Sequence, residues 1–108
     1  MILLQTILIM SRHSPENCPM FNEKSRKAYF EYAAKLPEIM QKHGVKLIGS
    51  WTAPTEHFNL AIFEGPNSDV VNKVLMEPEV MALSAFETYE IKRVLGMEES
   101  AEFLQQAK

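Results

Sequence analysis

The chain has 108 residues and a net charge of −3, with 46% hydrophobic and 23% charged residues, which is ordinary for one globular domain. The lack of a basic excess argues against nucleic acid as a partner. The single cysteine excludes an internal disulfide and fits a reducing compartment, so we expect a cytoplasmic protein. The apolar opening "MILLQTILIM" is broken by Gln5 and Thr6 and falls short of the roughly 20 residues that span a bilayer, so no membrane association is expected.

The first half of the chain predicts a strand, a long helix and a hairpin. Residues 2 to 12 are rich in Ile and Leu without helical spacing, which predicts a strand that is apolar on both faces. From residue 19 to residue 43, apolar side chains recur at steps of three and four, the pattern of an amphipathic helix. Pro37 is expected to kink this helix and Gly44 to end it. Residues 45 to 52 and 57 to 64 read as two strands joined by the short turn "APTE", an antiparallel hairpin.

The second half predicts two short helices and a last strand. In "GPNSD", Asn67 or Ser68 can cap a helix, and "MEPEVMALSAF" resembles a second short helix with Pro78 in its first turn. Residues 87 to 95 predict the final strand. We therefore expect one domain over residues 1–96, followed by a polar C-terminal tail, residues 97–108, with helical propensity.

The predicted order β-α-β-β-α-β defines an α+β fold of the ferredoxin-like type. In that fold an antiparallel sheet has the strand order 4-1-3-2, and the helices cover one face of it. The other face would be bare, although the first predicted strand is apolar on both sides. A bare apolar sheet is a large sticky patch. The sequence therefore predicts a homodimer formed by sheet packing.

By the order of these elements, and by the segment "EPEVMALSAF" before the last strand, residues 2 to 95 resemble the dimeric α+β barrel superfamily. Proteins of this superfamily include muconolactone isomerase-like proteins, antibiotic-biosynthesis-type monooxygenases and stress-responsive A/B barrel proteins. The resemblance implies a homodimer and, for an enzyme, cofactor-free chemistry on a small organic substrate. Haem-degrading members use an Asn, Trp and His set that the positions of Trp51, His57 and Asn59 do not match, so haem is not expected.

Polar side chains of the loop "SRHSPENCP" have a predicted meeting point at one end of the sheet. In the order 4-1-3-2, the end of the first strand lies beside the start of the third, which brings His13 near His57. Cys18 and Glu16 follow His13, and Glu56 precedes His57. Imidazole and thiolate together suit zinc, and nitrogen-rich sets also suit copper, iron or nickel. We therefore predict a metal site of His13, His57 and Cys18, with Glu16 or Glu56 as a further ligand or as a support for one.

The same residues also have ordinary structural roles. Ser14-Pro15 and Cys18-Pro19 are typical of turns and helix starts, and a lone cysteine is often a small buried hydrophobic residue. His43 falls at the C-terminal end of the long helix and, by topology, at the opposite end of the sheet from His13. We exclude His43 from the site.

A pocket for a small molecule is predicted between the long helix and the sheet. Its expected lining is Tyr32, Leu36, Trp51, Asn59 and Phe63, although strand parity leaves open which sheet face Trp51 occupies. Three functions remain open at this point. They are a metal-binding protein or metal-dependent small enzyme, a cofactor-free isomerase or monooxygenase with His13 or His57 as acid or base, and a non-catalytic binding protein.

Overall fold

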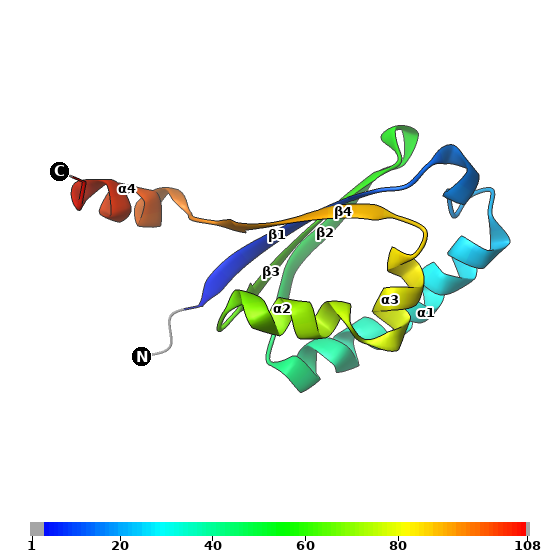
Figure 1. The fold of residues 1–108 in the computed structure, drawn as a ribbon, viewed down its shortest axis with the longest axis horizontal. Helices are drawn as coiled ribbons and strands as arrows, with labels where there is room; N and C mark the ends of the chain where they lie inside the picture. Colours follow the sequence, from blue (N-terminus) through cyan, green and yellow to red (C-terminus); the bar gives the residue numbers. More distant parts are fainter. Residues whose placement is uncertain (1–3, 108) are drawn as a thin grey trace.

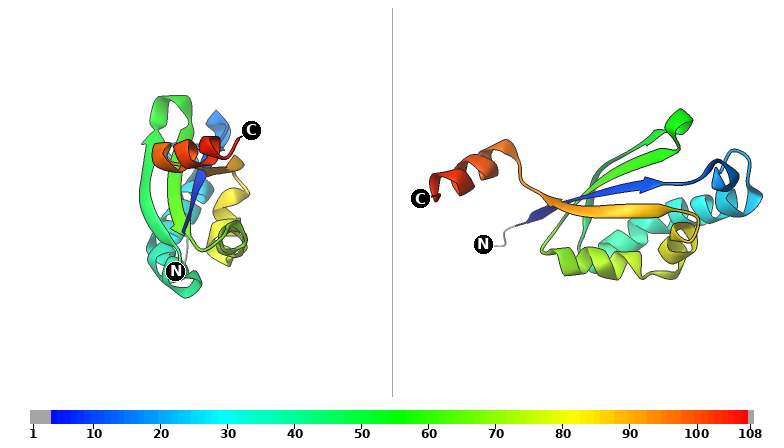
Figure 2. Two further views of the ribbon diagram at one scale, coloured as in Figure 1. Left: turned by 90° about the vertical axis from the view of Figure 1, so that its left-hand side faces the viewer. Right: turned by 45° about the horizontal axis from the view of Figure 1, so that its top comes forward.

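The structure, a computed structural model, describes residues 4 to 107 as an antiparallel sheet with helices on one face. The first strand starts at Gln5, and residues 2 and 3 of the predicted strand lie outside the described residues. Figures 1 and 2 show the helices between the first and last strands packed against the same side of the sheet. The elements are β1 (Gln5–Arg12), α1 (Glu23–His43), β2 (Lys46–Ala53), β3 (Phe58–Gly65), α2 (Ser68–Leu75), α3 (Pro78–Ser84), β4 (Thr88–Val94) and α4 (Met97–Gln105).

The sheet has the order β2-β3-β1-β4 with antiparallel neighbours, so the predicted ferredoxin-like arrangement is confirmed. The pairing of β1 with β3 runs without interruption from Gln5↔Gly65 to Arg12↔Phe58. This register fixes which residues meet at the end of the sheet. Among the described residues, no helix is long and apolar enough to cross a bilayer.

Helix α1 begins and ends at residues suited to those places. The side chain of Asn22 accepts a hydrogen bond from the main-chain N–H of Ser25 at 3.0 Å, which satisfies one of the free donors of the first turn. Gly44 closes the helix in the left-handed conformation (φ 67°), which a residue without Cβ adopts at little cost. Pro37 lies inside one continuous helix.

The core lies between the sheet and the helices, where α1 and α2 each bury several side chains and α3 buries Val80. Strand β1 contributes Ile7, which is fully buried. Burial of such aliphatic side chains contributes about 1.5–3 kcal/mol each. The buried cluster that joins the layers consists of Ile39, Val45, Phe63, Val74 and Val80.

The opposite face of the sheet carries no helix in the described part of the chain, and it is largely apolar over β1, β3 and β2, whereas β4 places Glu90 and Lys92 on it. Successive side chains of a strand point to opposite faces, so the neighbours of the core-facing Ile7 and Ile9 point outward. Trp51 belongs to this outer face and is 55% exposed. Its indole lies over Gly49, where a Cβ would come within 2.3 Å of the ring. The register pairs these outer residues with one another: Leu8 with Ile62, Met10 with Leu60, and Trp51 with Leu60.

Helix α4 projects away from the sheet beyond the end of β4, as Figures 1 and 2 show. It has no well-packed partner among the other described elements. As a result, large apolar side chains of α4 are exposed to solvent, namely Met97, Phe103 and Leu104. Residues 97–108, which the sequence suggested as a polar tail with helical propensity, therefore include an amphipathic helix whose apolar side is not packed against the other described elements.

Candidate metal centre and adjoining cavity

His13 and His57 meet where β1 ends and β3 begins. The main-chain N–H of His13 donates to the carbonyl of His57 at 3.1 Å, which continues the pairing one step past Arg12↔Phe58. The rings lie edge to face, with centroids 5.1 Å apart, and Nδ1 of His57 is 3.3 Å from Nε2 of His13. The strand register thus brings together two residues that are 44 positions apart in the chain.

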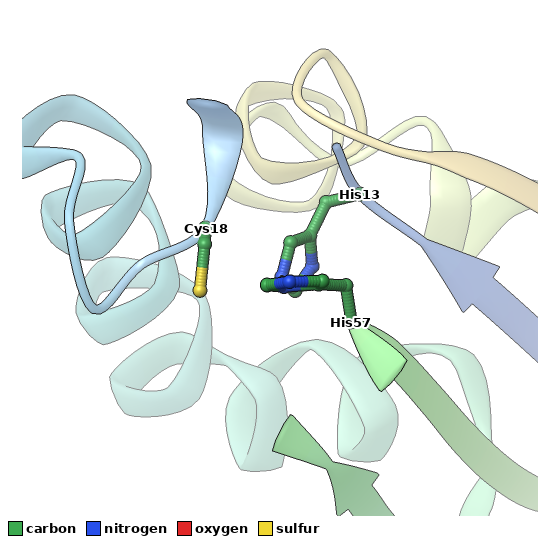
Figure 3. A group of neighbouring side chains, drawn as sticks. All are labelled: His13, Cys18 and His57. Carbon is green, nitrogen blue, oxygen red and sulfur yellow. The ribbon is translucent and has the colours of Figure 1, made fainter. Parts of the chain in front are cut away.

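Cys18 reaches the same place from the loop between β1 and α1. A single helical turn, Pro15–Asn17, bends this loop back, and the main-chain N–H of Cys18 donates to the carbonyl of Pro15 at 3.2 Å. The Cys18 side chain is buried, at 4% exposure. Figure 3 shows the three side chains converging from three segments. One ligand atom from each of His13, Cys18 and His57 lies within 4.8 Å of the others.

These separations are close to those of a metal site. Bonds of about 2.0–2.3 Å at tetrahedral angles place ligand atoms about 3.3–3.7 Å apart. The two imidazole nitrogens already satisfy this spacing at 3.3 Å. Small side-chain rotations, closing gaps of about 1 Å, would let one ion contact all three groups.

Glu16 and Glu56, which the sequence suggested as further ligands, do not belong to this cluster in the structure. Both side chains are exposed, and Glu56 accepts a hydrogen bond from the hydroxyl of neighbouring Thr55 at 2.7 Å. His43 lies away from the cluster, where its Nε2 is 2.8 Å from a carboxylate oxygen of Glu77.

The backbone of His57 adopts the left-handed conformation, with φ 53° and ψ 45°. Among residues 4–107 it is the only residue other than glycine with a positive φ. This conformation costs an L-residue about 1 kcal/mol or more and tends to be retained at functional sites. It turns the chain at the start of β3 and positions the imidazole beside His13.

The environment of His13 favours its neutral form. Burial, and then the charge of neighbouring His57, lower the pKa of the His13 imidazole below its usual value. A neutral imidazole has a free lone pair, and this is the form that binds metal ions.

A cavity of about 320 Å³ lies between the helices and the inner face of the sheet. Four residues predicted for the pocket are part of its lining: Tyr32, Leu36, Asn59 and Phe63. Trp51 is not, and the reason is a bulge in β2. The register shifts between Leu47 and Gly49, so Leu47 lines the cavity whereas Trp51 points to the outer face.

The cavity has one polar end, built around Glu87, a residue that the sequence did not single out. The amide of Asn59 donates to the Glu87 carboxylate at 3.3 Å, and the hydroxyl of Thr52 donates to the Asn59 carbonyl oxygen at 2.8 Å. Burial raises the pKa of the Glu87 carboxyl above its usual value, although hydrogen bonds from Ser11 and Asn59 oppose the shift. In the sequence, Glu87 is simply the first residue of a predicted strand, a position that many exposed acidic residues occupy. Nothing in the sequence therefore marked it as part of a site.

The cavity and the histidine–cysteine cluster are neighbours. The pair Ser11↔Asn59 lines the polar end of the cavity, and each histidine lies two residues further along its strand. At about 3.3 Å per residue, the two sites are about 7 Å apart along the sheet. His13 and His57 themselves are not in the cavity lining.

Comparison with known proteins supports the fold. No protein-family model matches the sequence, and no curated protein matches it. One similar structure is a proposed antibiotic biosynthesis monooxygenase from Caulobacter crescentus (TM-score 0.55, 12% identity, covering 86% of this chain and 91% of that one). Another is SnoaB, a cofactor-independent oxygenase from Streptomyces nogalater (TM-score 0.51, 13% identity, 87% and 93% covered). A third is a protein of unknown function from Rhodopseudomonas palustris (TM-score 0.52, 12% identity, 85% and 84% covered). The chain therefore shares with these structures the ferredoxin-like α+β fold that the order of its predicted elements implied.

Proposed function

We propose that the protein binds a transition metal ion, zinc first among the candidates, through ring nitrogens of His13 and His57 and the sulfur of Cys18. The observation that carries the proposal is the convergence of these three groups, from three separate segments, within 4.8 Å. Zinc accepts a mixed set of imidazole and thiolate ligands. Three protein ligands leave a fourth coordination position open, which is the pattern of catalytic rather than purely structural zinc sites.

The proposed role of Cys18 has a consequence for where the protein works. The thiolate is the form of cysteine that binds metals, so Cys18 must remain reduced. Cysteine is kept reduced in the cytosol, and we therefore propose a cytoplasmic location.

Element analysis of protein purified without a histidine tag, after incubation with zinc, copper, iron and nickel, tests the metal proposal. We expect about one ion per chain in the wild type and in a His43→Ala control, because His43 lies outside the cluster. A His13→Ala/His57→Ala variant should retain none. If the wild type holds no metal, or the double variant holds as much, the proposal is wrong.

A second candidate function is the binding of a small organic molecule in the cavity, with or without cofactor-free chemistry. It is favoured by the volume of about 320 Å³ and the mostly apolar lining with one polar end, the usual make-up of ligand sites. One structure with the same fold is a cofactor-independent oxygenase. In such a reaction the acid or base would be Glu87, since its carboxyl lines the cavity and the histidines do not.

Ligand-detected NMR with a panel of small aromatic molecules tests this second candidate. We expect binding to the wild type and its loss in Ala61→Phe, because the added ring fills the cavity that Ala61 lines. Ala82→Phe on the exposed side of α3 is the matched control and should bind normally. Binding that survives Ala61→Phe would locate the ligand elsewhere.

We further propose that the protein is a homodimer in which the outer sheet faces pack together. The support is the apolar outer face, whose centre is formed by Met10, Trp51 and Leu60. Helix α4 adds to it, because Phe103 and Leu104 are exposed and the helix, beyond the end of β4, has no well-packed partner among the other described elements. A two-fold arrangement would cover both surfaces at once, since each α4 would contact the other subunit.

A further inference from the structure

We propose that the cavity binds a small organic cation, an ammonium group on an apolar body, with Glu87 as its counter-ion and tyrosine rings around it. The inference rests on the proposed use of the cavity as a ligand site and specifies the class of ligand. Its basis is the charge of the lining: Glu87 is the one acidic residue, and no Lys, Arg or His is present among the described lining residues.

Among the described residues, no Lys, Arg or His pairs with the Glu87 carboxylate. Desolvation is the largest influence on the pKa of Glu87. The two residues that donate hydrogen bonds to its carboxylate, Ser11 and Asn59, are neutral. A partly buried carboxylate is costly unless it is paired with a positive charge. An ammonium group bound in the cavity would supply that charge.

The carboxylate retains acceptor capacity for such a ligand. An ionised carboxylate has about four lone-pair sites. Ser11 and Asn59 donate to it, and the hydroxyl of Thr52 fixes the Asn59 amide with its N–H₂ group toward Glu87. The neutral donors therefore orient Glu87 and leave room for a charged hydrogen bond, which is about twice as strong as a neutral one.

The rest of the lining also suits a cation. Three tyrosines, Tyr29, Tyr32 and Tyr89, line the same cavity as Glu87, and the rings of Tyr29 and Tyr32 lie 6.5 Å apart. The face of an aromatic ring attracts an ammonium ion within about 6 Å, worth about 0.5–2 kcal/mol. Burial, with smaller contributions from Glu87 and Tyr29, raises the pKa of Tyr32 to about 12, so its hydroxyl stays neutral.

The same charge distribution argues against anionic ligands. A phosphate or carboxylate in the cavity would meet the Glu87 charge with no cation to offset it. Nucleotides, phosphorylated cofactors and carboxylic acids therefore do not fit. Neutral molecules remain the alternative, and they differ from cations in not needing the charge of Glu87.

Calorimetric titration with phenethylamine and with phenethyl alcohol, its uncharged counterpart of the same shape, tests the proposal. We expect the wild type to bind the amine at least about tenfold more tightly than the alcohol, from the charged hydrogen bond and the aromatic contacts combined. Glu87→Gln keeps the size and hydrogen bonding of the side chain and should abolish that preference while still binding the alcohol. Glu38→Gln, at an exposed position of α1 outside the cavity lining, should keep the preference.

Each other outcome has a defined meaning. Equal affinity for the two probes, or a preference that survives Glu87→Gln, would overturn the cation proposal. If only the alcohol binds, the cavity is a site for neutral molecules and only the cation inference is wrong. If neither probe binds, the cation inference and the proposed use of the cavity both fail.

Discussion

A His57→Gly variant is expected to lose all stabilisation by zinc, yet to be as stable as the wild type, or up to about 1 kcal/mol more stable, without metal. The substitution removes one proposed ligand. It also places glycine where the backbone has φ 53°, which relieves a cost of about 1 kcal/mol. In the wild type, zinc at about one hundred times its dissociation constant should add about 2.7 kcal/mol to the free energy of unfolding.

Urea denaturation with and without zinc, under reducing conditions, measures both effects. His43→Ala is the control and should keep the full zinc effect, because His43 is paired with Glu77 outside the cluster. If His57→Gly is instead destabilised without metal, its backbone conformation serves packing rather than ligand placement. If zinc stabilises the variant as much as the wild type, His57 is not a ligand.

A Leu60→Lys variant is expected to be monomeric, whereas the wild type should have twice the chain mass of 12.4 kDa. Leu60 lies on the outer sheet face, beside Met10 on β1 and Trp51 on β2. A lysine there would bring like charges together across a two-fold interface and leave them without water, at a cost of several kcal/mol.

Light scattering at micromolar concentration measures the mass in solution and so distinguishes the dimer from the monomer. Phe30→Lys, at an exposed position of α1, introduces the same charge away from the sheet and should leave the dimer intact. A wild type that has only the mass of one chain would remove the dimer proposal. A Leu60→Lys variant that stays dimeric would place the interface elsewhere.

The fold was predictable because its signals are local and repeated. Apolar residues at steps of three and four mark α1 and Gly44 marks its end, although the helix begins at Glu23, four residues later than the pattern predicted. The face of Trp51 was not predictable, since it depends on a bulge between Leu47 and Gly49 that follows from packing rather than from alternation. Helix α4 has helical propensity but no well-packed partner among the other described elements, so no sequence pattern indicated where it lies.

The candidate site was predictable only where the strand order determines it. The order β2-β3-β1-β4 brings the end of β1 to the start of β3, and so His13 to His57. Glu16 and Glu56 lie within three residues of His13 and His57 in the sequence, yet both side chains are exposed to solvent. Glu87 was missed because its significance comes from desolvation and from the amide of Asn59, which depend on the packed structure.

The metal proposal is tested most directly by X-ray absorption at the zinc edge of the metal-loaded protein. The arrangement of His13, Cys18 and His57 predicts one sulfur at about 2.3 Å and two imidazole nitrogens at about 2.0–2.1 Å, with a light-atom ligand in the fourth position. In Cys18→Ser the sulfur signal should vanish while the two imidazole signals remain. A zinc ion surrounded only by oxygen and nitrogen in the wild type, or one whose imidazole signals survive His13→Ala/His57→Ala, would contradict a metal centre in this cluster.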